Sequence, residues 1–157
     1  MSVLELKVPP LLLVIIFAML MWWVSLEANI ASVQLSLSST TRVGVLILAF
    51  IIGAGFAISG VKAFKEAQTT VNPTRPNTSS SLVTSGIYQY TRNPMYVGFL
   101  LSLLGWGIFL ANLIALSLCM VFIWYMNRFQ IEPEERALER LFGDEVLTYR
   151  QHVRRWV

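Results

Sequence analysis

The 32 residues from 95 to 126 form the longest apolar run in the chain, and Asn112 is the one residue within it that carries an amide or a charge. A single helix of this length would measure about 48 Å, whereas the hydrocarbon core of a bilayer is about 30 Å thick. We therefore interpret the run as a hairpin of two short helices that turns near Ala111 and Asn112. One strongly tilted helix is the alternative.

Two further apolar runs, at residues 10–26 and 43–61, are each long enough to cross a bilayer. The 157 residues suffice for one domain; they are 55% hydrophobic and 13% charged, with a mean hydropathy of +0.62. These values predict an all-α integral membrane protein with about four transmembrane helices, at 10–26, 43–61, 95–110 and 113–126. A signal peptide is the alternative for the first run, but the run is long for one and no clear cleavage site follows it.

The basic residues predict the orientation of these spans. Eleven of the twelve Lys and Arg residues fall in the N-terminal segment, the 62–93 loop and the 127–157 tail, and Arg42 is the exception. Four spans with both termini in the cytoplasm place all eleven on one side, as the positive-inside rule requires. We therefore expect a cytoplasmic loop and a cytoplasmic helical tail that can meet, and a location in a bacterial inner membrane.

A polar and aromatic stretch, residues 86–98, stands just before the longest apolar run. Pro94 suits the first position of a helix, so Asn93 is the expected N-cap. The free N–H groups of that helix end would attract an anionic group such as a carboxylate. Tyr88, Tyr90 and Arg92 alternate, so an extended segment would present them on one face.

The tail contributes acidic residues. Glu132 and Pro133 indicate a helix start, Gly143 indicates its end, and a second short helix is expected over roughly 144–153. Glu134 and Glu135 could point toward the membrane domain, where a carboxylate suits an amino group or ribose hydroxyls. Taken singly, these acids are also typical of surface residues in the first turn of a helix, where the helix dipole favours negative charge. The Tyr and Arg residues before the longest apolar run are also typical of a membrane interface.

Other chemistries find little support in the composition. The single cysteine, Cys119, lies in an apolar run, and the single histidine, His152, is near the end, so we expect no metal site and no histidine-dependent triad. The net charge is +3, but the basic residues are not clustered as in a nucleic-acid-binding protein.

In combination, these segments resemble the isoprenylcysteine carboxyl methyltransferase superfamily, in particular its small bacterial, phospholipid-methyltransferase-like members. The resemblance covers about residues 64–157. It is carried by residues 70–73 (Thr-Val-Asn-Pro), 82–88 (Leu-Val-Thr-Ser-Gly-Ile-Tyr), 91–98 (Thr-Arg-Asn-Pro-Met-Tyr-Val-Gly) and 134–138 (Glu-Glu-Arg-Ala-Leu), followed by Phe142, Gly143 and Tyr149.

The resemblance implies a membrane methyltransferase that uses S-adenosylmethionine, held at the cytoplasmic membrane face, and a lipophilic or small thiol or carboxylate acceptor that arrives from the bilayer. It implies catalytic roles for Arg92 and Glu135. The cofactor site would be formed by Tyr88, Arg92, Asn93, Pro94, Tyr96, Glu134 and Glu135.

The sequence departs from the family pattern in several places. Asn93 stands where many members have histidine, Val146 stands near the position of a family tyrosine, and Gln130 replaces an arginine implicated in substrate handling in eukaryotic members. The last change leaves the acceptor open. The alternatives are a non-catalytic membrane subunit or assembly factor that keeps the pocket, and an oxidoreductase related to membrane sterol reductases. Neither the oligomeric state nor which of the two glutamates faces the cofactor follows from the sequence.

Overall fold

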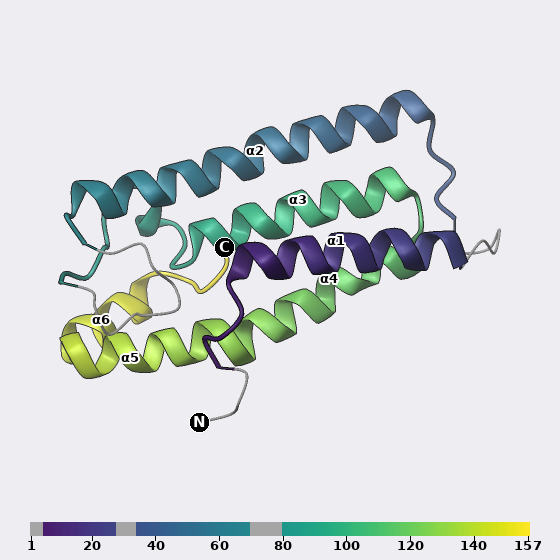
Figure 1. Ribbon diagram of the computed structural model, residues 1–157. Helices are drawn as coiled ribbons and strands as arrows, with labels where there is room; N and C mark the ends of the chain where they lie inside the picture. The colour runs from purple at the N-terminus through teal and green to yellow at the C-terminus, as the bar shows by residue number, and fades with distance from the viewer. Residues whose placement is uncertain (1–4, 28–33, 70–79) are drawn as a thin grey trace.

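Four apolar helices run side by side in the computed structural model, which describes residues 5–27, 34–69 and 80–157 (Figure 1). Within these ranges, three helices are long and apolar enough to cross a membrane: α1, α2 and the helix that continues from α4; α3 is apolar but shorter. No strand occurs in the described ranges, and the prediction of an all-α membrane protein is confirmed. The helices are α1 (Pro10–Glu27), α2 (Ser39–Glu66), α3 (Pro94–Leu110) and α4 (Leu113–Tyr125).

The longest apolar run is a hairpin, as predicted, and the tilted single helix is excluded. Ala111 ends α3 in the left-handed conformation (φ 52°), which reverses the chain. Asn112 then caps α4, because its side-chain oxygen accepts a hydrogen bond from the N–H of Ala115 at 3.0 Å.

Helix α2 extends beyond the predicted span of 43–61 at both ends. Its first residue is Ser39, because the Ser38 hydroxyl accepts a hydrogen bond from the N–H of Thr41 at 3.1 Å. Its last turn, ending at Glu66, takes residues from the predicted loop of 62–93. Lysine and glutamate are good helix formers, so the end of an apolar run did not mark the end of the helix.

Helix α3 packs closely along α2 because glycines face each other. A Cβ built on Gly53 would lie 2.6 Å from the carbonyl oxygen of Gly98 and 2.9 Å from Ser102 Oγ. Gly60 similarly lies against Pro94, the first residue of α3. Small residues at these points let the two backbones approach, and they fix the beginning of α3 against the end of α2.

This packing predicts unequal effects of two alanine substitutions in α2. Gly53→Ala is expected to destabilise the protein by about 1–3 kcal/mol relative to Gly55→Ala, because the new methyl group meets α3. A Cβ on Gly55 has nothing within 4 Å, so the stability of that variant should change only through the higher helix propensity of alanine. Unfolding in sodium dodecyl sulfate, followed by circular dichroism, measures both. Equal stabilities would show that α2 and α3 are less tightly packed than described.

The tail begins differently from its prediction. Helix α4 passes through a π-helical turn, Met126–Ile131, directly into α5 (Glu132–Phe142), and the three form one continuous helix (Figure 1). Glu132 and Pro133 therefore do not start a helix, and the acidic residues after them do not face a free helix end. The predicted end at Gly143 and the second short helix, α6 (Asp144–His152), are confirmed.

One end of the bundle gathers the polar segments. The end of α2, the beginning of α3, and α5 and α6 lie together there, and the C-terminus lies near the start of α3 (Figure 1). A short 3₁₀ helix, η3 (Gly86–Gln89), precedes α3. The predicted motif at residues 70–73 lies outside the described residues. The loop before α3 and the tail do meet, through the hydrogen bond from the Arg92 N–H to the Arg154 carbonyl oxygen at 3.0 Å.

Candidate functional site

The carboxylate of Glu134 lies against the first turn of α3. Its Oε1 accepts a hydrogen bond from the Tyr96 hydroxyl at 2.6 Å and another from Gln130 Nε2 at 2.7 Å. Tyr96 is buried and packs in the same core cluster as Met126 and Ile131. A carboxylate that leaves water needs such donors, because an unpaired buried charge is costly. The two helices are thereby joined by a polar contact inside the apolar core.

Glu135, the next residue, points to a different set of partners. Arg92 Nη2 lies 3.1 Å from its Oε1, and Arg155 Nη2 and Arg150 Nη2 lie 2.7 Å and 3.5 Å from its Oε2. The three arginines come from the segment before α3, from α6 and from the C-terminal residues. One buried carboxylate therefore joins three parts of the chain by charge-assisted contacts.

Arg92 holds donors that are not used by the described part of the protein. Its side chain is 13% exposed, and Nε and Nη1 are buried without a hydrogen-bond partner among the described residues. Burial lowers the pKa of this guanidinium from its usual range, and the nearby Glu135 opposes that shift. Buried N–H groups are normally paired. Two adjacent unpaired donors of this kind fit an oxygen-rich or anionic ligand.

Asn93 occupies the N-cap position of α3, as predicted, but its side chain does not cap the helix. Its Nδ2 instead donates to the carbonyl oxygen of Arg155 at 2.9 Å, while its N–H donates to Thr91 Oγ1 at 3.2 Å. Pro94 begins α3, which confirms its predicted helix position. The amide of Asn93 therefore holds the C-terminal segment rather than the helix end.

Tyr88 and Tyr90 do not share a face, contrary to the prediction of an extended segment. Tyr88 lies in η3, is buried and packs edge-on against Phe64, with ring centroids 5.4 Å apart, whereas Tyr90 is 73% exposed. The Tyr149 hydroxyl donates to the carbonyl oxygen of Tyr88 at 2.6 Å. Burial, then the neighbouring Tyr149 and Glu134, raise the pKa of Tyr88, so this phenol stays neutral.

The predicted site residues thus fall into two neighbouring groups. Tyr96 and Glu134 form one, and Arg92 and Glu135 form the other; Tyr88 and Asn93 border them. Sequence reasoning missed Gln130, Tyr149, Arg150 and Arg155 as partners. Gln130 stands four residues before Glu134, a spacing that indicates one helix face once the helix is known to be continuous. Nothing in the sequence pairs Arg155 with Glu135, because that contact depends on how the tail folds back.

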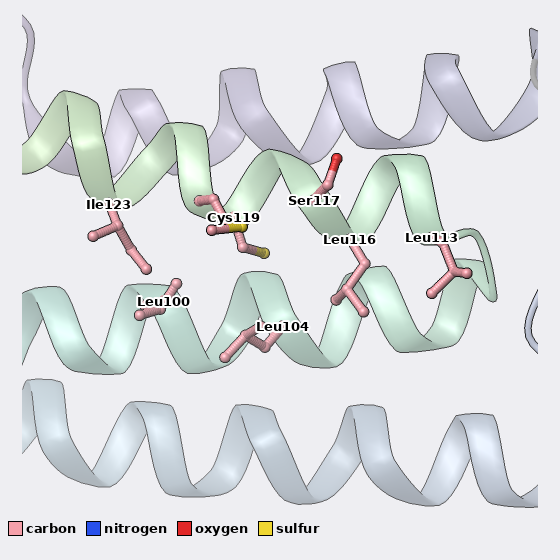
Figure 2. Close-up of a pocket in the computed structure, with 8 residues that line it drawn as sticks. Leu100, Leu104, Leu113, Leu116, Ser117, Cys119 and Ile123 are labelled. Carbon is pink, nitrogen blue, oxygen red and sulfur yellow. The ribbon is translucent and has the colours of Figure 1, made fainter. Parts of the chain in front are cut away.

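A separate hollow lies between α3 and α4 (Figure 2). Its volume is about 340 Å³, and Leu100 and Leu104 of α3 face Leu116, Cys119 and Ile123 of α4 across it. It has no charged lining residue. The hollow is apolar, like the helices around it, and none of the predicted site residues lines it.

Comparisons with known proteins identify relatives of the segment that carries these contacts. The model of the phospholipid methyltransferase family matches residues 41–145. The protein-S-isoprenylcysteine O-methyltransferase of Schizosaccharomyces pombe is 30% identical over 118 residues, which are 75% of this chain and 48% of that protein.

Two shorter matches agree with this result. The Homo sapiens protein-S-isoprenylcysteine O-methyltransferase is 37% identical over 73 residues, 46% of this chain and 26% of that protein. An uncharacterized Haemophilus influenzae protein is 48% identical over 63 residues, 40% of this chain and the whole of that protein. The matches to these named methyltransferases span about half of their length or less.

Proposed function

Because the chain belongs to the phospholipid methyltransferase family, we propose that it is a membrane-embedded methyltransferase that uses S-adenosylmethionine. The observation that supports this proposal most directly is that two buried donors of Arg92, beside Glu135, have no partner among the described residues. The cofactor carries a carboxylate, an ammonium group, ribose hydroxyls and a sulfonium. A site in which cationic donors and carboxylate acceptors lie near one another suits these groups.

The residues divide these tasks by their chemistry. Arg92 would bind the carboxylate through these donors, since hydrogen bonds between a guanidinium and an anion are charge-assisted. Glu134 would accept hydrogen bonds from the ammonium group or the ribose hydroxyls, while Tyr96 and Gln130 hold it in place. Glu135 would keep Arg92 oriented. Tyr88 and Pro94 would border the site on the side of η3 and α3.

When bound, S-adenosylmethionine supplies a methyl group activated by its sulfonium. The protein then has to place an acceptor in line with that methyl group and exclude water. A thiolate or carboxylate acceptor needs no general base. This agrees with the described contacts of the site, none of which involves histidine: His152 is exposed and donates to the carbonyl oxygen of Thr148. We therefore propose a lipophilic or small thiol or carboxylate acceptor that arrives from the bilayer.

The distribution of basic residues supports a cytoplasmic position for the site, and we propose the same for both termini. The methyl donor would then be available from the cytoplasm, while the acceptor would enter from the membrane.

Calorimetric titration of the purified protein in nanodiscs with S-adenosylmethionine tests the proposed function. Wild type is expected to show saturable binding. Arg92→Lys should weaken it about tenfold, because lysine keeps the charge but loses the planar guanidinium and its several N–H donors. Arg140→Lys, an exposed position on α5, is the matched control and should bind as wild type does. Absence of binding by folded wild type would refute the proposal.

A further inference from the structure

We infer that residues 5–8 form a strap that holds the π-helical turn Met126–Ile131, and that Glu5 is thereby a positioning residue for Gln130 and Glu134. This inference deepens the proposed function, and its effect on ligand binding rests on that function. The contacts of the strap do not depend on the proposed function, because they are made by residues outside the two groups of site residues.

The continuous helix needs an external partner at this turn because of Pro133. In an α-helix the carbonyl of Phe129 would accept a hydrogen bond from the N–H of residue 133, and proline has none. The proline ring also crowds that carbonyl. The helix widens here instead of breaking, and the N–H of Glu132 bonds the carbonyl oxygen of Asn127, five residues earlier.

The strap supplies the missing donor. The N–H of Leu6 lies 3.0 Å from the carbonyl oxygen of Phe129. Leu6 adopts a left-handed backbone conformation, with φ of 57°, that a leucine rarely takes. A strained residue persists where the surrounding contacts require it, and here the strain accompanies a hydrogen bond to the carbonyl that Pro133 cannot serve.

Glu5 fixes the strap to the turn and to the helix that follows it. Its side chain is 4% exposed; Oε2 lies 3.1 Å from Arg136 Nη2, and Oε1 lies 3.8 Å from Arg128 Nη1. Arg128 belongs to the π-helical turn, and Arg136 follows Glu135 in α5. A buried carboxylate binds strongly only where cations meet it, so these two arginines hold Glu5 and Glu5 in turn links them.

The turn matters to the site because it sets the rotation of α5 relative to α4. One extra residue in a helical turn rotates all that follows by about 100° around the helix axis. In the π-helical form, Gln130 and Glu134 both reach the hydroxyl of Tyr96 on α3. A change in the shape of this widened turn would rotate Glu134 about the helix axis away from Tyr96, so the strap positions this carboxylate by holding the turn.

Hydrogen–deuterium exchange of the full chain in nanodiscs tests the strap without reference to activity. Glu5→Gln keeps the size of the side chain and removes its charge, and it should accelerate exchange about tenfold in residues 127–136 alone. Glu66→Gln is the matched control, because Glu66 forms an exposed pair with Lys62 at 3.7 Å. Glu5→Asp, which keeps the charge, should restore most of the protection.

A binding measurement completes the test. The dissociation constant for S-adenosylmethionine should rise about fivefold to tenfold in Glu5→Gln and keep its wild-type value in Glu66→Gln. Unchanged exchange in residues 127–136 would overturn the inference, and so would acceleration spread over the whole protein, since Glu5 would then support the fold and not the turn. If wild type binds no S-adenosylmethionine, the proposed function fails, and the exchange result alone decides the strap.

Discussion

Replacement of Glu134 by alanine is expected to lower the affinity for S-adenosylmethionine about 100-fold, the largest effect on binding that the site predicts. Oε1 of Glu134 accepts hydrogen bonds from both the Tyr96 hydroxyl and the Gln130 amide. Its removal takes away the proposed acceptor for the ammonium group or ribose hydroxyls. It also removes the oxygen to which the Tyr96 hydroxyl and the Gln130 amide both donate hydrogen bonds.

Glu132→Ala provides the matched control for this variant. Glu132 lies on the same helix and pairs with Arg128 at 3.4 Å, on a side chain that is 39% exposed. Its loss should change the dissociation constant less than twofold, because exposed pairs contribute little. Calorimetry measures both variants, and methyl transfer to lipid and thiol extracts provides a second readout. Equal affinities in Glu134→Ala and Glu132→Ala would remove Glu134 from the proposed site.

Replacement of Glu135 by glutamine is expected to have the largest effect on stability, about 3 kcal/mol. The substitution keeps the shape of the side chain but leaves Arg92, Arg150 and Arg155 around a neutral group. Partial exposure of Arg150 and Arg155 moderates their repulsion, whereas Arg92 is largely enclosed. The C-terminal residues should detach from the bundle, because Arg155 is one of their main contacts.

Glu139→Gln isolates the role of the enclosed carboxylate. Glu139 also lies on α5 and also pairs with Arg150, at 3.2 Å, but its side chain is 44% exposed. We expect a loss below about 1 kcal/mol for this variant. Unfolding in sodium dodecyl sulfate gives the stabilities, and proteolysis at the C-terminal arginines reports detachment of the tail. If Glu135→Gln is as stable and as protected as Glu139→Gln, the arginine cluster does not hold the tail.

The sequence by itself determined the features that depend on neighbouring residues. The apolar runs identified the membrane helices because each backbone group in a bilayer must be bonded within its own segment. The turn at Ala111 and Asn112, the beginning of α3 at Pro94 and the end of α5 at Gly143 were predictable because turn and cap chemistry is local. The candidate site residues came from motif resemblance, and their roles remain predictions.

Only the tertiary structure decided how those segments meet. Pro133 indicated a helix start, yet the helix continues through it, because a widened turn and the N–H of Leu6 compensate for the missing hydrogen bond. Asn93 indicated a cap, yet its amide bonds Arg155, 62 residues away. Contacts between such distant residues leave no periodic pattern in the chain. They depend on which helix ends the bundle brings together and on which buried charges then require partners.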